Sequence, residues 1–362
     1  MLRYHQNLGT FPNQDTHSSP RKGACVVAVT IMDIAARAET SKSTVSRYLN
    51  GGSISQVTAN RIRRAIKELE YQPNVNARRL VNSRASAIGI VFDDISNYIY
   101  GGMMAGIQSA AREFGYTCLF LSRASERALE SESLSLFASS MVDGLILVTF
   151  AQRDPQDVRL LRESGLPIVL VGDAAGEAGL PTVDVDNLNG TQAEVEMLIR
   201  QGHRRIAYLQ GPDNMPAAHS RQRGYLRALE CAGIEADRNL IVRVNWTVKD
   251  AYRTVSRLVQ EQSFTALVGS NASSTYGGLQ ALMDAGKRVP QDVAVAGFDD
   301  DPICEHTRPS ITTLSQPLAQ MGRIAANQLV SRIRGGPDNV CATYVLPTMM
   351  LRETTPKQES ER

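Results

Sequence analysis

The stretch IMDIAARAETSKSTVSRYLN (31–50) decides the fold of the first part of the chain. Thr30 and Asp33 have the spacing of a capping box, which predicts that a helix begins at Ile31. Polar residues at 39–41 interrupt this helix, and a second short helix follows over 43–49. The small Ala35 and the branched Val45 suit the crossing of two helices. The pattern predicts a helix-turn-helix, completed by a third helix after residue 55.

The second helix of this motif carries side chains suited to DNA. It exposes Lys42, Ser43, Thr44 and Arg47, which are donors for base edges and phosphates in the major groove. Its N-terminal end also offers backbone N–H groups to a phosphate. The alternative is an ordinary helical hairpin with a solvated polar face.

The distribution of charge supports the first interpretation. The whole chain of 362 residues has a net charge of only +2. Residues 28–84, however, hold ten Lys and Arg against four acidic residues, whereas the chain from residue 85 onward has an acidic excess. A basic head on an acidic body indicates a polyanionic partner, with chance asymmetry as the alternative.

Composition divides the chain into five segments. Residues 1–28 are expected to be a disordered extension, 29–73 a helix-turn-helix domain, and 74–86 (NVNARRLVNSRAS) a polar linker. A larger domain is expected over 87–355, before a charged tail at 356–362. No run of about 18 apolar residues and no signal-peptide pattern occur, so we expect a cytoplasmic location.

The larger domain alternates apolar strands with amphipathic helices, which is typical of parallel sheets covered by helices. Strands are predicted at 88–92, 117–121, 144–149, 167–171, 205–209, 266–269 and 293–296, and helices at 102–114, 191–201 and 277–285. The similar stretches LRESGLPIVLVGD (161–173) and LMDAGKRVPQDVAVAGFDD (282–300) indicate two doubly wound lobes. Ligands bind beyond the carboxyl ends of such strands, here near Asp93, Asp173 and Asp299.

From Ala28 to about Leu351 the chain resembles the LacI/GalR family of transcription regulators. The motifs SKSTVSRYLN (41–50) and YQPNVNARRL (71–80) carry the resemblance first. IGIVFDDISN (88–97), VDGLILV (142–148), GHRRIAYLQGP (202–212) and VAVAGFDD (293–300) then follow in the order of the family. One departure is Glu39, which stands where the family usually has a turn glycine.

The resemblance implies a helix-turn-helix DNA-binding domain joined to a two-lobed α/β effector domain, similar to periplasmic binding proteins. It implies a homodimer on near-palindromic double-stranded operator DNA, a sugar or sugar derivative as effector, and no cofactor. The residues expected at the DNA are Thr30, Ser41, Lys42, Ser43, Thr44, Arg47, Asn50, Asn74, Ala77 and Leu80. Residues 74–80 are expected to form a hinge helix on the operator, with Leu80 as the wedge in the minor groove beside the small Ala77.

The resemblance also implies an effector site between the two lobes. Arg221, Asn271 and Asp299 match positions that hydrogen-bond ligand hydroxyls, and Trp246 matches a stacking position. Further residues expected where the cleft should lie are Asp93, Tyr100, Arg123 and Asn189. The family's common Asn-Asp pair is Asn271-Ala272 here, so the hydroxyl network is expected to differ.

Three classes of function are weighed. The first is a ligand-responsive DNA-binding regulator, most simply a repressor of a catabolic or transport operon. The second is a solute-binding protein without a DNA role, against which residues 29–84 count. The third is an enzyme, but no GxSxG, HExxH, GxGxxG or Walker A pattern occurs, and neither the five histidines nor the five cysteines have metal-ligand spacing. We therefore expect no catalytic residue and no metal. The short tail lacks a heptad repeat, which favours a dimer over a tetramer.

Overall fold

The computed structural model describes residues 29–49, 52–71, 85–93, 98–122, 141–150, 155–172, 179–337 and 341–355. The chain forms two compact units, Met1–Val81 and Asn82–Arg362. The boundary between them falls within the segment expected to be a linker.

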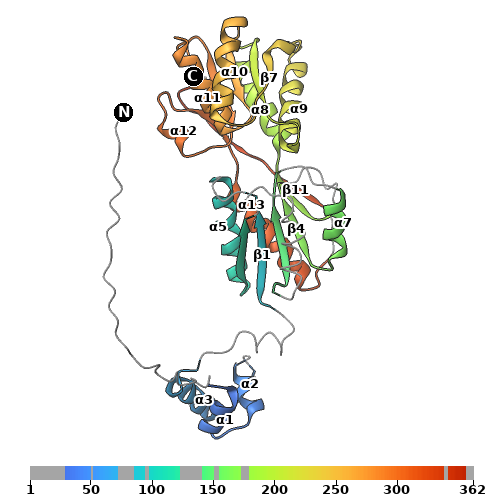
Figure 1. Cartoon of the computed structure of the whole chain (residues 1–362), viewed down its shortest axis with the longest axis vertical. Coiled ribbons are helices and arrows are strands. Elements are labelled where there is room, and N and C mark those ends of the chain that lie inside the picture. Colours follow the sequence, from blue (N-terminus) through green and yellow to red (C-terminus); the bar gives the residue numbers. More distant parts are fainter. Residues whose placement is uncertain are drawn as a thin grey trace, which may run out of the picture. The chain divides into compact units, whose positions relative to one another are not determined.

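The first unit contains the three helices α1 (Ile31–Arg37), α2 (Lys42–Leu49) and α3 (Gln56–Glu68), coloured blue in Figure 1. The predicted start of α1 is confirmed, because the N–H and the hydroxyl of Thr30 both donate to Asp33 Oδ2 at 2.7 Å. The side chains of Ile34, Val45 and Ile62 are fully buried between the helices. This small apolar core fixes α2 across α1.

The first lobe of the second unit is a six-stranded parallel sheet in the order β2-β1-β3-β4-β5-β11. Its strands are β1 (Ala87–Phe92), β2 (Thr117–Ser122), β3 (Gly144–Val148), β4 (Ile168–Val171), β5 (Thr182–Val185) and β11 (Ala342–Val345). Its helices are α5 (Tyr98–Glu113), α7 (Pro155–Glu163) and α13 (Leu318–Ile333).

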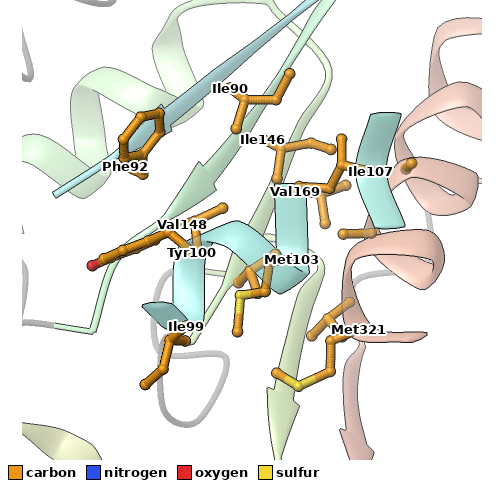
Figure 2. Close-up of a cluster of buried hydrophobic side chains, with 14 of the residues drawn as sticks. Ile90, Phe92, Ile99, Tyr100, Met103, Ile107, Ile146, Val148, Val169 and Met321 are labelled. Atoms are coloured by element: carbon orange, nitrogen blue, oxygen red, sulfur yellow. The ribbon is translucent and has the colours of Figure 1, made fainter. Parts of the chain in front are cut away.

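The core of this lobe lies between the sheet and the paired helices α5 and α13. Figure 2 shows Met103 and Ile107 of α5 beside Ile146 and Val169 of the sheet, with Met321 from α13 closing the cluster. The two helices approach so closely that a Cβ at Gly106 would clash with the backbone of Ala319. Glycine is required there because backbone meets backbone.

The second lobe is a six-stranded sheet in the order β7-β6-β8-β9-β10-β12, in which only β12 runs antiparallel. Its strands are β6 (Ile206–Gln210), β7 (Ile241–Arg243), β8 (Ala266–Gly269), β9 (Ala294–Phe298), β10 (Thr312–Ser315) and β12 (Thr348–Met350). Its helices are α8 (Asn187–Arg200), α9 (Pro216–Cys231), α10 (Val248–Glu261), α11 (Ala272–Asp284) and α12 (Ile303–His306), with a short 3-10 turn at Arg238–Leu240.

The chain passes between the lobes three times, after β5, after β10 and after β11. The carboxyl ends of the strands in both sheets therefore lie near these crossings, which is where doubly wound folds bind ligands. The seven strands expected from the sequence are confirmed to within two residues of their ends. No helix among the described residues is long and apolar enough to span a bilayer.

Candidate functional site

The first candidate site is the outer face of α2. Lys42, Ser43 and Arg47 are exposed there, whereas Val45 on the opposite side is buried in the core of the unit. Neither Lys42 nor Arg47 forms an ion pair with an acidic residue of the described segments. Two charges that the fold leaves without counterions are available to phosphates.

Two of the residues expected at the DNA also act as helix caps. Ser41 Oγ accepts a hydrogen bond from the backbone N–H of Thr44 at 3.1 Å, so it caps α2. The exposed Thr30 precedes α1 in a capping box, in which its N–H and hydroxyl both donate to Asp33 Oδ2. The remaining predicted positions, Asn50, Asn74, Ala77 and Leu80, lie outside the described residues.

The turn between α1 and α2 has an unusual backbone. Glu39 has φ 48°, a left-handed conformation that costs a residue with a side chain roughly 1 kcal/mol. The departure noted in the sequence is therefore a strained position: the turn keeps a conformation that glycine adopts more easily. The Glu39 carboxylate lies 3.5 Å from the guanidinium of Arg61 on α3, in an exposed pair that offsets little of the strain.

The second candidate site is a cavity of about 230 Å³ in the second unit, bounded by residues of both lobes. Its wall is built from residues that follow strands or begin helices. They are Asp93, Ile99, Tyr100, Phe150, Asp184, Val185, Asn187, Met215, Ala217, Arg221, Trp246, Asn271, Asp299 and Gln316. The cavity thus sits at the carboxyl ends of both parallel sheets, as the topology requires.

Arg221 of α9 is the most constrained side chain of the wall. Its Nε donates to Asn187 Oδ1 at 2.7 Å and its Nη1 donates to the carbonyl oxygen of Ser270. Nη1 also lies 3.6 Å from Asp299 Oδ2, and the guanidinium carbon lies 3.6 Å from the centre of the Phe298 ring. The cation is therefore fixed in position before any ligand arrives.

Trp246 and Asn271 form the adjoining wall. The indole Nε1–H of Trp246 donates to Ser270 Oγ at 2.7 Å, and its backbone has φ 52°, a rare conformation for a bulky residue. Asn271 Oδ1 accepts the backbone N–H of Ser274 at 2.9 Å and caps α11. Strained or pre-positioned side chains of this kind gather at functional sites.

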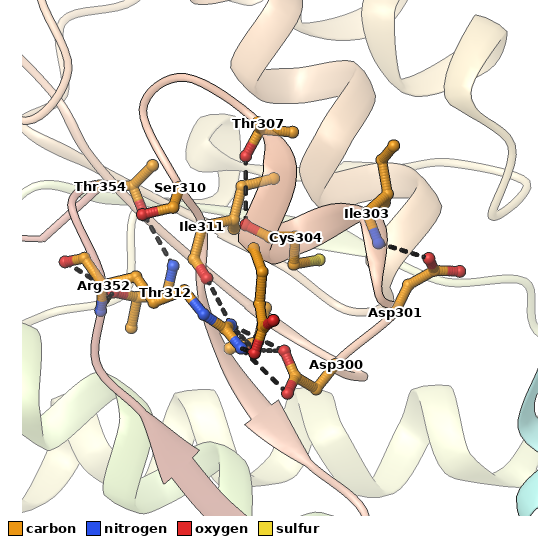
Figure 3. Close-up of polar contacts among 12 residues, drawn as sticks. Asp300, Asp301, Ile303, Cys304, Thr307, Ser310, Ile311, Thr312, Arg352 and Thr354 are labelled. Atoms are coloured by element: carbon orange, nitrogen blue, oxygen red, sulfur yellow. Dashed lines mark hydrogen bonds and ion pairs between the residues drawn. The ribbon is translucent and has the colours of Figure 1, made fainter.

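Asp299 is held by an anchored loop. Figure 3 shows the next residue, Asp300, clamped by the guanidinium of Arg352, with contacts of 2.7 Å to Oδ1 and 3.1 Å to Oδ2. The hydroxyl of Thr313 donates to the same carboxylate at 2.6 Å. Asp299 itself has φ 72° and accepts a hydrogen bond from the side-chain amide of Gln316. The contacts of Asp300 with Arg352 and Thr313 hold the loop, and the loop places the Asp299 carboxylate at the cavity.

Six of the predicted effector residues line this one cavity: Asp93, Tyr100, Arg221, Trp246, Asn271 and Asp299. Asn189 was also expected at the cavity, but it is not part of the wall. Its side chain is exposed and donates to Asp186 Oδ2 at 2.7 Å. Helix α8 begins at Asn187, so the helical register turns Asn187 inward and Asn189 outward. Arg123 lies outside the described residues.

The sequence analysis missed Asp184, Asn187 and Gln316, which the crossings between the lobes bring to the cavity. A signal was present for Asp184, because an acidic residue interrupts the apolar strand TVDV, all of which is buried. Among the described residues, no group of three or more His, Cys, Asp or Glu side chains could hold a metal ion.

Comparison with known proteins places both units. Residues 30–74 match the model of bacterial regulatory proteins of the lacI family, and residues 195–355 match a periplasmic binding protein-like domain. The chain is 34% identical to the HTH-type transcriptional regulator CelR of Thermobifida fusca over 90% of this chain and 98% of that protein. It is 32% identical to the HTH-type transcriptional repressor CytR of Escherichia coli K12, over 85% of this chain and 91% of that protein. A solved CelR–cellobiose complex matches with 31% identity and a TM-score of 0.69, over 90% of this chain and 99% of that one.

Proposed function

Because the chain belongs to the LacI family, whose members are DNA-binding transcription regulators and not enzymes, we propose that it is a repressor controlled by a sugar-like metabolite. It acts in the cytoplasm on a catabolic or transport operon. The proposal rests on the cavity wall around Arg221 and Asp299 in the second unit. The first unit of the same chain exposes Lys42 and Arg47, which suit DNA.

The chemistry of the wall suits a polyhydroxyl compound. Carboxylates accept hydrogen bonds from hydroxyl groups, a guanidinium donates to ring and hydroxyl oxygens, and an indole face covers the apolar side of a pyranose. Asp93, Asp299, Arg221 and Trp246 supply these groups. The volume of about 230 Å³ is slightly below the roughly 300 Å³ at which small-molecule pockets begin, which favours a small sugar. A relative of known structure carries cellobiose.

On the DNA side, we expect two copies of the chain to bind a near-palindromic duplex. Each α2 enters the major groove of one half-site with Ser43, Thr44 and Arg47 toward the bases. The segment 74–80 forms a hinge helix only on the operator, with Leu80 inserted in the minor groove. Leu80→Ala then weakens operator binding and leaves the affinity for the sugar intact.

Control follows from a difference in affinity between two states. A ligand shifts an equilibrium only as far as it prefers one state, and a 100-fold preference supplies about 2.7 kcal/mol. In this proposal the sugar changes the angle between the two lobes, and thereby the distance between the two linkers of the dimer. Hinge-helix formation is favoured or blocked accordingly.

The test is a thermal-shift screen of monosaccharides, disaccharides and nucleosides with the full chain, repeated with the preferred duplex present. A ligand of the cavity raises the melting temperature through mass action, and the duplex changes the size of that rise. Arg221→Met removes the response, whereas Arg227→Met, on the exposed side of the same helix, keeps it. A protein that binds every duplex equally and no sugar at all contradicts the proposal.

A further inference from the structure

A fully buried acid, Glu194, lies behind the effector cavity. Asn187, Thr191 and Glu194 are spaced by four and three residues along α8, so they share one face of the helix. Asn187 lines the cavity and accepts the hydrogen bond from Arg221. Glu194 lies about 10 Å further along the helix axis and has no exposed surface. A column of polar side chains therefore runs from the cavity wall into the core of the second lobe.

Beyond Asn187, the side-chain oxygens of this column have no hydrogen-bond partner among the described residues. Neither carboxylate oxygen of Glu194 has a hydrogen-bond partner among the described residues, and the same holds for Thr191 Oγ1 and the hydroxyl of Tyr208. The surroundings are apolar, because Val195 and Leu198 of α8 belong to the core of the lobe. A carboxylate that is buried without donors is strongly unfavourable in its ionised form. Burial accordingly raises the pKa of Glu194 to about 8.

The guanidinium of Arg221 already has other partners. Arg221 directs Nε to Asn187 and Nη1 to Ser270, and its counterion is Asp299. Arg221 is thus the counterion of Asp299 rather than of Glu194, and the amide of Gln316 also donates to Asp299. The positive charge of Arg221 lowers the pKa of Glu194, and the negative charge of Asp299 raises it.

The other elements packed on this face add no competing titration near neutral pH. Tyr208 of β6 and Tyr225 of α9 are buried phenols whose pKa values are raised by burial. The strands β9 (Ala294–Phe298) and β10 (Thr312–Ser315), which also pack against α8, carry no ionisable side chain. Burial is therefore the main cause of the raised pKa of Glu194, and the two charges at the cavity wall modify it.

We propose that Glu194 is a proton-binding site coupled to the effector cavity, protonated at neutral pH and sensitive to the charges of Arg221 and Asp299. At a pH near 8, where Glu194 is partly ionised, a ligand that places a negative charge against Arg221 tightens the hold on this proton and binds with proton uptake. An uncharged sugar leaves the proton in place. The statements about ligands rest on the proposed function, whereas the proton site itself does not.

The first test is the pH dependence of stability. In the unfolded chain Glu194 has the ordinary glutamate pKa of 4.5, whereas in the folded chain its pKa is about 8, so the folded chain binds more protons between these values. Its contribution to stability is therefore present below pH 4.5 and is lost as the pH rises through 8. Glu194→Gln removes this loss, and its urea midpoint relative to wild type must rise from about pH 5 to about pH 8.

The matched control is Glu196→Gln. Glu196 lies on the same helix, but 36% of its side chain is exposed and it pairs with Arg200 at 3.9 Å. This variant must follow the wild-type profile. A Glu194→Gln profile parallel to wild type overturns the proposal.

The second test addresses the coupling. The infrared carbonyl band of a protonated carboxyl group, identified by its loss in Glu194→Gln, is titrated in the full-length protein. Removing the cation with Arg221→Met must move the midpoint to higher pH, by about one pKa unit for a tenfold tighter proton. Removing the like charge with Asp299→Asn must move it to lower pH. A midpoint that neither variant moves overturns the coupling, and a protein that shows both shifts but binds no sugar overturns only the proposed effector.

Discussion

The Nη1 atom of Arg221 lies 3.6 Å from Oδ2 of Asp299, and only 5% and 6% of these two side chains are exposed. The two residues come from different elements, α9 and the loop after β9. A buried pair of this kind adds little net stability, but removing one partner leaves an uncompensated charge in the interior. Arg221 and Asp299 must therefore both be present for the fold to be stable and for the cavity wall to form.

Arg221→Met is expected to lower the free energy of unfolding by about 3 kcal/mol, because Asp299 is left buried without its counterion. Urea denaturation of the full chain measures this loss. Arg243→Met is the control, since its pair with Asp213 has 60% and 54% exposed side chains and is worth less than about 1 kcal/mol. Equal losses of stability in the two variants would contradict the expectation that breaking the buried pair costs more than breaking the exposed one.

Gly211→Ala is expected to disturb the cavity without touching a polar residue. A Cβ at Gly211 would clash with the indole ring of Trp246, so the ring must shift. Trp246 is the one tryptophan of the chain, and its fluorescence emission therefore reports this shift directly. Sugar affinity should fall along with the change in emission.

Gly101→Ala provides the control for this experiment. Apart from its chain neighbours and the backbone of its own helix turn, no described atom lies within 4 Å of a Cβ at that position of α5. The emission of Trp246 should stay as in wild type, and stability should rise by up to about 1 kcal/mol from the better helix propensity of alanine. An unchanged spectrum in Gly211→Ala would show that the indole is not packed on Gly211.

Glu39→Gly is expected to stabilise the first unit by about 1 kcal/mol, because glycine adopts the left-handed backbone of this turn without a steric cost. Hydrogen exchange at the amides of Ile34 and Val45 in the full chain should slow about fivefold. Ala36→Gly is the matched control: it lies in the last turn of α1, where glycine costs about 1 kcal/mol. Faster exchange in Glu39→Gly would mean that the carboxylate contributes more than the strain removes.

The elements of the fold were predictable where local signals suffice. The capping box of Thr30 and Asp33 and the helix crossing at Ala35 and Val45 depend on signals within a few residues, and the structure confirms them. Most strands found in advance are buried apolar runs such as Ile88–Phe92, whereas the edge strand β2 is only partly buried. The short strands β5, β7, β10, β11 and β12, of three or four residues each, were not predicted. The pairing of β11 and β12 also depends on crossings between the lobes.

The residues of the cavity were likewise predictable only where a local signal exists. Residues that follow a recognisable strand, such as Asp93 and Asp299, were expected from the sequence. Asn187 was missed because the helix was expected to begin at residue 191, whereas α8 begins at Asn187, and the register of a helix decides which side chain points inward. Glu194 has a signal of its own, since a glutamate occupies a position seven residues from Asn187 on the inward face of α8. Only the packing of α9 and β6 shows that it is buried.

Arg47→Ala is expected to weaken operator binding and to reduce its dependence on salt. Arg47 is exposed on α2, and a Cβ at Gly52 would come within 2.5 Å of its Cγ, so Gly52 leaves room for the stem of the side chain. Loss of one phosphate contact lowers the slope of log K against log salt by about 1. Arg227→Ala, on the exposed side of α9, controls for net charge and should leave the slope unchanged. Weaker binding with an unaltered slope would instead assign Arg47 to a base edge, where its loss also relaxes specificity at one position of the operator.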